Sequence, residues 1–69
     1  MLVLNIIIPL YNSNYIEKQL LSIKKLITKS ISIRLILIDD WSDAIYRKIY
    51  IKFGVRFKTL HFKIILIVN

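Results

Sequence analysis

Residues 33–40 read Ile-Arg-Leu-Ile-Leu-Ile-Asp-Asp and are the most informative stretch of the chain. The run is apolar apart from Arg34, and it stops abruptly at Asp39 and Asp40. A short apolar run of this composition is typical of a buried strand. Parallel α/β sheets bind their ligands beyond the carboxyl ends of such strands. We therefore expect a strand over 33–38 that ends at a ligand-binding edge.

The sequence before this stretch predicts a strand and a helix. Residues 2–8 form a nearly continuous apolar run that Pro9 closes, which indicates a strand buried on both faces. Asn14 is a good helix N-cap, and Glu17 three residues later completes a variant capping box. Helical spacing over 15–27 then gives one apolar stripe. That stripe consists of Ile16, Leu20, Ile23 and Ile27.

The sequence after the acidic pair predicts a second helix and a further strand. Ser42 or Asp43 can cap the helix, which is expected over 44–53. Gly54 then supplies a left-handed C-cap, because glycine adopts a positive φ at little cost. Apolar and basic residues alternate at the start of 55–62, which favours a half-exposed strand there.

The expected elements alternate between strand and helix. The apolar run 64–68 adds either a fourth strand or an unnatural end. Such alternation is typical of parallel sheets with right-handed crossovers. A chain of 69 residues has room for one small domain. We therefore expect an α/β domain over 1–69 with two helices and three or four mostly parallel strands.

Composition excludes several classes of protein. The chain has no Cys, so it can form neither a disulfide nor a thiolate zinc site. Its single Gly is too few for a glycine-rich phosphate loop. A hydrophobic content of 57% argues against intrinsic disorder. The formal net charge of +7 favours a location near an anionic membrane surface or an acidic ligand.

The sequence pattern predicts neither a transmembrane segment nor a signal peptide. A spanning helix needs about 18 nearly uncharged apolar residues, whereas the longest apolar run here is 64–68. The start of the chain lacks the basic region and the small-residue cleavage site of a signal peptide. We expect a cytoplasmic protein whose charge is compatible with a peripheral place at the inner membrane face.

Several conspicuous residues are expected to be structural. His61 lies between apolar neighbours in a strand-like stretch, which is typical of an ordinary packed or edge histidine. Tyr46 and Tyr50 are one helical turn apart and are expected to cover the sheet. A solvated helix face is the simplest interpretation of the lysines of the first helix and the turn after it. These are Lys24, Lys25 and Lys29.

Two motifs stand at the ends of the first two expected strands. Residues 6–13 read Ile-Ile-Ile-Pro-Leu-Tyr-Asn-Ser, and residues 37–43 read Leu-Ile-Asp-Asp-Trp-Ser-Asp. This pairing resembles the N-terminal part of family 2 glycosyltransferases, the inverting enzymes with a GT-A nucleotide-sugar-binding fold. The likeness covers residues 4–43 well, and 44–62 only as a general α/β continuation.

The resemblance implies a function and a set of site residues. The fold would be a partial, Rossmann-like GT-A unit, and 1–69 would be the truncated nucleotide-sugar-binding part of such a domain. The parent activity would transfer a sugar from a nucleotide-diphosphate donor to a glycan or lipid-linked acceptor. Nucleotide-binding residues would be Pro9 and Leu10, which shape the first turn, and Tyr11, whose ring lies beside the base. Asp39 would accept a hydrogen bond from the base, commonly uracil, and Asp40 would steady the loop.

The chain also departs from the family pattern. Trp41 stands where the family has Gly, and one residue of the usual turn is missing before Asp43. An indole at this position is expected to deform the pocket or to fill part of it. The chain ends before the family's Asp-x-Asp motif, which would bind a divalent cation (Mg or Mn), and before the general base. We therefore expect this chain alone to hold no cofactor and to be catalytically inactive.

The residues alone leave an alternative of another class open. The second hypothesis is a non-enzymatic basic module that binds anionic lipid or nucleic acid. No RNA- or DNA-binding signature accompanies the basic residues, which are spread over every expected element, so nucleic acid is the weaker partner. Strands designed for burial on both faces would have only two helices to cover them, which predicts self-association.

Overall fold

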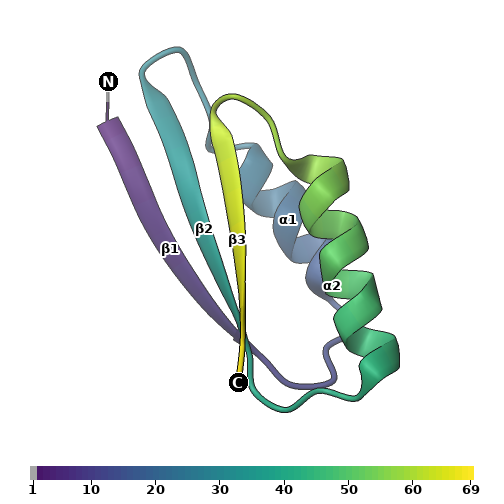
Figure 1. Ribbon diagram of the computed structural model, residues 1–69. Helices are drawn as coiled ribbons and strands as arrows, with labels where there is room; N and C mark the ends of the chain where they lie inside the picture. The colour runs from purple at the N-terminus through teal and green to yellow at the C-terminus, as the bar shows by residue number, and fades with distance from the viewer. Residues whose placement is uncertain (1) are drawn as a thin grey trace.

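The computed structural model describes residues 2–69, which form a three-stranded sheet and two helices (Figure 1). All strand pairs are parallel, and the strand order is β1-β2-β3. The elements are β1 (Leu2–Leu10), α1 (Ile16–Lys24), β2 (Ile31–Asp39), α2 (Ala44–Phe57) and β3 (Phe62–Val68). The expected α/β class with a parallel sheet is confirmed, and the arrangement is compatible with a partial Rossmann-like unit.

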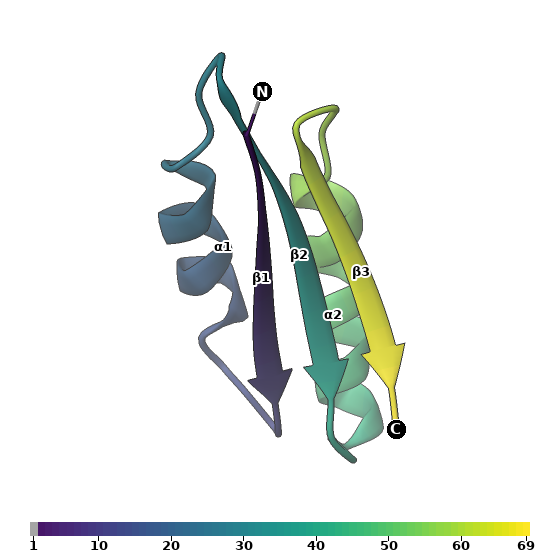
Figure 2. The same ribbon diagram turned by 90° about the vertical axis from the view of Figure 1, so that its left-hand side faces the viewer.

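Both α1 and α2 lie on the same face of the sheet (Figure 2). Strands that follow one another across a sheet are joined by crossovers of the same hand, which bring their helices to one side. The core therefore lies between this face and the helices. Its buried apolar residues are Leu10, Ile16, Leu20, Ile33, Leu35, Leu37, Tyr50, Phe57 and Phe62. Within residues 2–69, neither helix combines the length and the apolar composition needed to cross a bilayer.

The prediction that the first strand is buried on both faces is wrong. β1 forms one edge of the sheet, and its burial alternates along the strand. Leu10 is buried, for example, whereas Ile7 is 61% exposed. A single helix layer covers one face only, so the apolar run has side chains left uncovered. Pro9 lies inside β1, where an edge strand tolerates its missing N–H.

The first helix is shorter than predicted and begins differently. It covers Ile16–Lys24, and Tyr15 occupies the N-cap position with no side-chain hydrogen bond, so Asn14 is not the cap. The N–H of Tyr15 instead donates to the Ser13 hydroxyl at 3.2 Å. The predicted apolar stripe is confirmed, because its first two residues are buried and the other two pack against the core.

The second helix continues through the position where its end was predicted. α2 passes Gly54, which does not adopt the left-handed conformation. Phe57 is buried at the end of the helix, and Lys58 follows it in an extended conformation. The strand predicted over 55–62 is therefore wrong. A Cβ at Gly54 would lie 3.5 Å from Ile64 Cγ2, an ordinary van der Waals distance, so the packing of α2 against β3 does not require glycine there.

The apolar run 64–68 belongs to the third strand. β3 pairs in parallel with β2, and Leu35 lies opposite Ile64 in the register. Among residues 2–69, this run is neither a fourth strand nor an irregular end. The second helix takes the residues that would have formed the additional strand.

Candidate functional site

The carboxyl edge of the sheet brings the two sequence motifs together. Leu10 and Asp39 are register partners at the ends of β1 and β2. The N–H of Asp40 donates to the Leu10 carbonyl at 2.8 Å, and the N–H of Asn69 donates to the Asp39 carbonyl at 3.0 Å. These bonds hold the strand ends level, so the loops that follow, 11–15 and 40–43, start side by side.

Side chains bind the two loops to each other. The N–H of Asp43 donates to Asn12 Oδ1 at 2.8 Å, and Asn12 Nδ2 donates to Asp43 Oδ2 at 3.3 Å. The backbone N–H of Asn12 donates to the Ser42 hydroxyl at 2.9 Å. Asn12 has a φ of 44°, and asparagine is one of the few residues that adopt this left-handed conformation readily. Asp43 is the N-cap of α2, but its side chain does not cap the helix because it contacts Asn12 instead.

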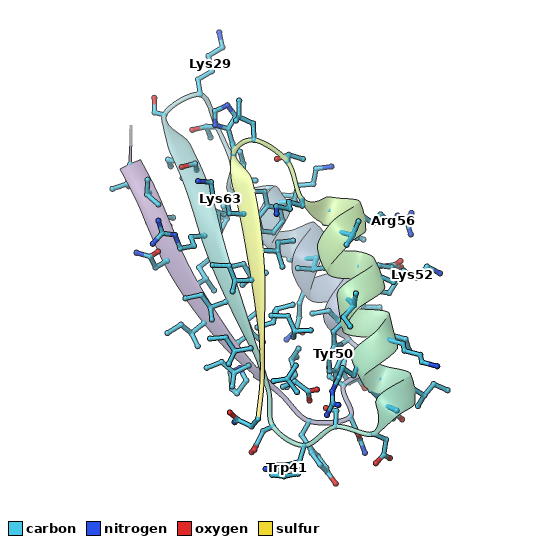
Figure 3. The ribbon with its side chains drawn as sticks, in the orientation of Figure 1. Lys29, Trp41, Tyr50, Lys52, Arg56 and Lys63 are labelled. Atoms are coloured by element: carbon cyan, nitrogen blue, oxygen red, sulfur yellow. The ribbon has the colours of Figure 1, made fainter. Side chains whose placement is uncertain are left out.

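Tyr50 of α2 contacts both loops from the side of the helix (Figure 3). Its side chain is fully buried, and its hydroxyl accepts a hydrogen bond from the N–H of Ser13 at 2.8 Å. The same hydroxyl lies 3.2 Å from the Ser42 hydroxyl. Tyr50 was expected only to cover the sheet, and the sequence analysis missed its polar role. A usable signal was available, because a buried tyrosine usually finds a partner for its hydroxyl.

Asp39 is fully buried and accepts hydrogen bonds at both carboxylate oxygens. Oδ1 accepts from the N–H of Ser42 at 2.9 Å, and Oδ2 accepts from Nε of Arg47 at 2.8 Å. Arg47 also donates from Nη2 to the Ser42 carbonyl at 3.4 Å. The sequence analysis did not anticipate Arg47, although its position eight residues after Asp39 places it one turn into the helix. Asp39 therefore fixes the start of the second loop.

The environment of Asp39 determines its charge. Burial acts to raise the pKa of Asp39, because a carboxylate loses its hydration there. The hydrogen bonds from Arg47 and Ser42, together with the positive charge of Arg47, act in the opposite direction. Their combined effect is larger, so the pKa of Asp39 lies below its usual value. Asp39 is therefore ionised at neutral pH.

The structure separates the predicted site residues into two groups. Leu10 and Asp39 are buried, and they belong to the packing and hydrogen bonding of the edge. Tyr11 is 67% exposed, and Asp40 is exposed as well. Because Tyr11 and Asp40 directly follow paired strand residues, their backbones lie side by side at the edge. Pro9 is exposed one residue earlier in β1.

Trp41 combines a left-handed backbone with an exposed side chain. Its φ of 63° lies in the left-handed region, which explains why a glycine suits this position. The indole is 73% exposed and lies at the outer end of the loop (Figure 3). The expectation that the indole deforms the pocket or fills part of it stays a prediction. The loop accepts the backbone strain of a tryptophan and directs the ring outward.

The acidic side chains of this edge do not form a metal site. Within residues 2–69, no group of three or more His, Cys, Asp or Glu side chains is arranged to hold a metal ion. Both oxygens of Asp39 are already engaged by protein donors, and one oxygen of Asp43 accepts from Asn12. The residues described here therefore do not fit the divalent cation that the resemblance implies for the full-length family.

Comparison with known proteins finds no match for this chain. No protein-family model matches the chain, and neither a curated protein nor a solved structure matches it. The structure itself defines the class of protein as a small parallel α/β unit. Side chains join its loops 11–15 and 40–43 at the carboxyl edge of the sheet.

Proposed function

We propose that the chain is a nucleotide-binding unit of the family 2 glycosyltransferase type. The carboxyl edge would bind the nucleoside diphosphate part of a nucleotide sugar, with uracil as the base. One observation carries the proposal. The two loops are held together by Asn12, Ser42 and Asp43, and they leave Tyr11 and Asp40 exposed beyond neighbouring strands. Ligands of parallel α/β sheets bind in this position.

The exposed residues have the chemistry that a uracil ring requires. The ring offers an N–H donor, and the carboxyl group of Asp40 offers oxygens that can accept it. Tyr11 provides an aromatic surface on which the base can stack. Within residues 2–69, no hydrogen bond or salt bridge engages the Asp40 side chain, so its oxygens are available to a ligand.

The roles of the two aspartates are exchanged relative to the sequence prediction. Asp39 has no exposed surface, and donors from Ser42 and Arg47 occupy its oxygens. We therefore assign Asp39 to positioning the loop and Asp40 to the base. The burial of Asp39 and the exposure of Asp40 support this assignment, and the motif alone does not distinguish the two residues.

The bonds between the loops favour binding because they order the site before the ligand arrives. A loop that is already fixed loses less conformational entropy on binding. Asn12, Ser42 and Tyr50 supply this order without contributing exposed groups of their own to the base. Pro9 has a fixed φ and therefore restricts the backbone at the end of β1, just before the first loop.

We assign binding, and no transfer step, to the residues described here. Sugar transfer needs a cation or its equivalent to neutralise the departing diphosphate, and a base to deprotonate the acceptor hydroxyl. Residues 2–69 offer no cluster that fits the cation. Presentation of a donor sugar to a glycan or lipid-linked acceptor would depend on groups outside this unit.

Isothermal titration calorimetry with uridine diphosphate tests the proposal. We expect the wild-type chain to bind, and Asp40→Asn and Tyr11→Ala each to weaken binding roughly tenfold, through loss of a charge-assisted hydrogen bond and of base stacking. Glu17→Gln is the matched control for charge, and Tyr15→Ala is the control for an exposed tyrosine, since Tyr15 is 65% exposed. Circular dichroism confirms that each variant is folded.

Two results would contradict the proposal. A folded wild-type chain that gives no heat of binding has no nucleotide site. Equal losses in Asp40→Asn and Glu17→Gln would show that binding follows net charge rather than the carboxyl edge. A third result would contradict only the assignment of the two aspartates. If Asp39→Asn weakened binding without changing the circular dichroism spectrum and Asp40→Asn bound normally, Asp39 would bind the base, as the sequence predicted.

A further inference from the structure

The amino edge of the sheet, opposite the candidate site, is basic. Two loops lie there: residues 25–30 lead into β2, and residues 58–61 lead into β3. Figure 3 shows Lys29 at the tip of the first loop and Lys63 at the start of β3, far from Trp41. The exposed cations of this edge are Lys25, Lys29, Arg34, Lys58 and Lys63.

Acidic residues do not balance these cations. The chain has four acidic residues. Asp39, Asp40 and Asp43 belong to the carboxyl edge, and Glu17 pairs with Arg56 at 3.7 Å. The amino edge therefore carries uncompensated positive charge among the residues that the structure describes.

An exposed leucine accompanies the cations in each loop. Leu60 is 83% exposed in the second loop, and Leu26, which is 49% exposed, lies in the turn directly after α1. A shallow hollow of about 80 Å³ adjoins Leu60 and is lined in part by Val3, His61 and Lys63. Large apolar side chains at loop tips are unfavourable in water. Their combination with cations is typical of a surface that contacts both the headgroups and the acyl boundary of a bilayer.

Backbone hydrogen bonds hold the two loops at the same level. The N–H of Ile33 donates to the His61 carbonyl at 2.8 Å, which attaches the second loop to the start of β2. The N–H of Leu2 donates to the Ser30 carbonyl at 2.7 Å, which attaches the first loop to β1. Both loops therefore lie at the same end of the sheet (Figure 1).

We propose that the amino edge docks on an anionic lipid bilayer. Lys25, Lys29, Lys58 and Lys63 contact the headgroups, and Leu26 and Leu60 enter the boundary between headgroups and acyl chains. The positive charge is attracted to the negative surface potential of an anionic leaflet. Docked in this way, the molecule presents its carboxyl edge to the aqueous side.

The distribution of aromatic residues favours lipid over nucleic acid. Proteins that bind single-stranded nucleic acid stack bases on aromatic side chains close to their cations. Here the most exposed aromatic residues, Tyr11, Tyr15 and Trp41, follow the carboxyl ends of β1 and β2. The amino edge offers leucine in their place, and leucine partitions into the bilayer without recognising a base.

Co-sedimentation with vesicles tests the proposal. We expect the chain to bind vesicles of phosphatidylcholine and phosphatidylglycerol in equal parts, and to bind pure phosphatidylcholine far more weakly. Each lysine near an anionic surface contributes about fivefold to partitioning, so Lys29→Gln with Lys58→Gln should lower it about 25-fold. Leu60→Ser should lower it roughly tenfold by removing apolar insertion.

Matched control variants distinguish the position of the charged and apolar side chains from their number. Lys48→Gln with Lys52→Gln removes the same charge from exposed positions of α2 and should change partitioning much less. Val55→Ser changes an α2 residue that is 74% exposed, close to the exposure of Leu60, and should leave partitioning unchanged. Circular dichroism verifies the fold of all four variants.

Three results would overturn the proposal. One is that the folded chain fails to bind anionic vesicles. The second is an equal loss in the Lys48–Lys52 and Lys29–Lys58 double variants, which would show that net charge alone acts. The third is tighter binding to a single-stranded oligonucleotide than to anionic vesicles, with no effect of Leu60→Ser, which would identify the edge as a nucleic-acid surface.

Discussion

The two ends of the sheet are built in opposite ways. At the carboxyl end, side chains join the loops, with Asn12, Ser42 and Tyr50 each contacting the other loop or both loops. At the amino end, backbone bonds attach each loop to a strand, and the lysine and leucine side chains are exposed. The difference teaches which end can recognise a defined shape. A cross-linked loop pair suits a rigid ligand, whereas free side chains suit a surface without fixed geometry.

The largest difference between the ends is expected on removal of Asp39. Asp39→Ala leaves the buried N–H of Ser42 and the guanidinium of Arg47 without their acceptor, which should cost about 2 kcal/mol of folding free energy. Lys63→Ala at the exposed end should change stability by less than about 0.5 kcal/mol. Urea denaturation measures both. Similar stabilities of the two variants would show that the polar cluster does not hold the carboxyl edge.

Acid should weaken the carboxyl end specifically. The pKa of Asp39 is lowered in the folded state, so its contribution to stability is complete above its unfolded-state pKa of about 3.9. The contribution is lost as the pH falls further through the lower, folded-state pKa. Urea denaturation of the wild type and of Asp39→Asn, across this acidic range, measures the effect. The difference between the two should shrink as the pH falls, and a difference independent of pH would refute the ion pair's role.

Removal of one hydroxyl should have an intermediate effect. Tyr50→Phe leaves the N–H of Ser13 without its acceptor in a partly buried place, at a cost of about 1 kcal/mol. Tyr46→Phe is the control, because Tyr46 lies on the same helix and makes no side-chain hydrogen bond within residues 2–69. Thermal denaturation followed by circular dichroism compares the two. Equal melting temperatures would mean that the Tyr50 hydroxyl does not stabilise the loops.

The smallest expected effect is a stabilisation. Trp41 has a left-handed backbone that costs about 1 kcal/mol for a residue with a Cβ, so Trp41→Gly should gain roughly 0.5 kcal/mol after the extra unfolded-state entropy of glycine. Leu60→Gly at the other end should instead destabilise, since Leu60 has no such strain. A higher free energy of unfolding for Trp41→Gly and a lower one for Leu60→Gly, measured by urea denaturation, would support the comparison of the ends. Destabilisation by both would contradict it.

Local patterns predicted much of this fold because they act within one element. The apolar runs 2–8 and 33–38 became strands, and the stripe of Ile16 and Leu20 became the buried side of a helix. The helix end predicted at Gly54 was wrong because the local preference of glycine for a helix end competes with the packing of Phe57 one turn later. Periodicity reveals apolar side chains without revealing which of them are covered: two helices were expected to be too few to cover the sheet, but the alternating exposure of β1 was not predicted.

The candidate site was predictable only in outline. The motifs placed Tyr11, Asp39 and Asp40 at strand ends, and the register brings those ends together. Asp39 continues the alternating burial of β2, but its partner Arg47, and the contact of the Tyr50 hydroxyl with a loop 37 residues earlier in the chain, were not predicted. Contacts between residues so far apart leave no periodic trace in one sequence.

The central claim is that a nucleotide binds at the carboxyl edge and not at the basic amino edge. Nuclear magnetic resonance of the ¹⁵N-labelled chain, titrated with uridine diphosphate, tests it residue by residue. The structure predicts saturable shifts of the amide signals of residues 11–15 and 40–43, with the signals of 25–30 and 58–61 unmoved. Shifts confined to the two basic loops would contradict the claim, because they would show that the diphosphate binds the lysines and leaves the Tyr11–Asp40 edge empty.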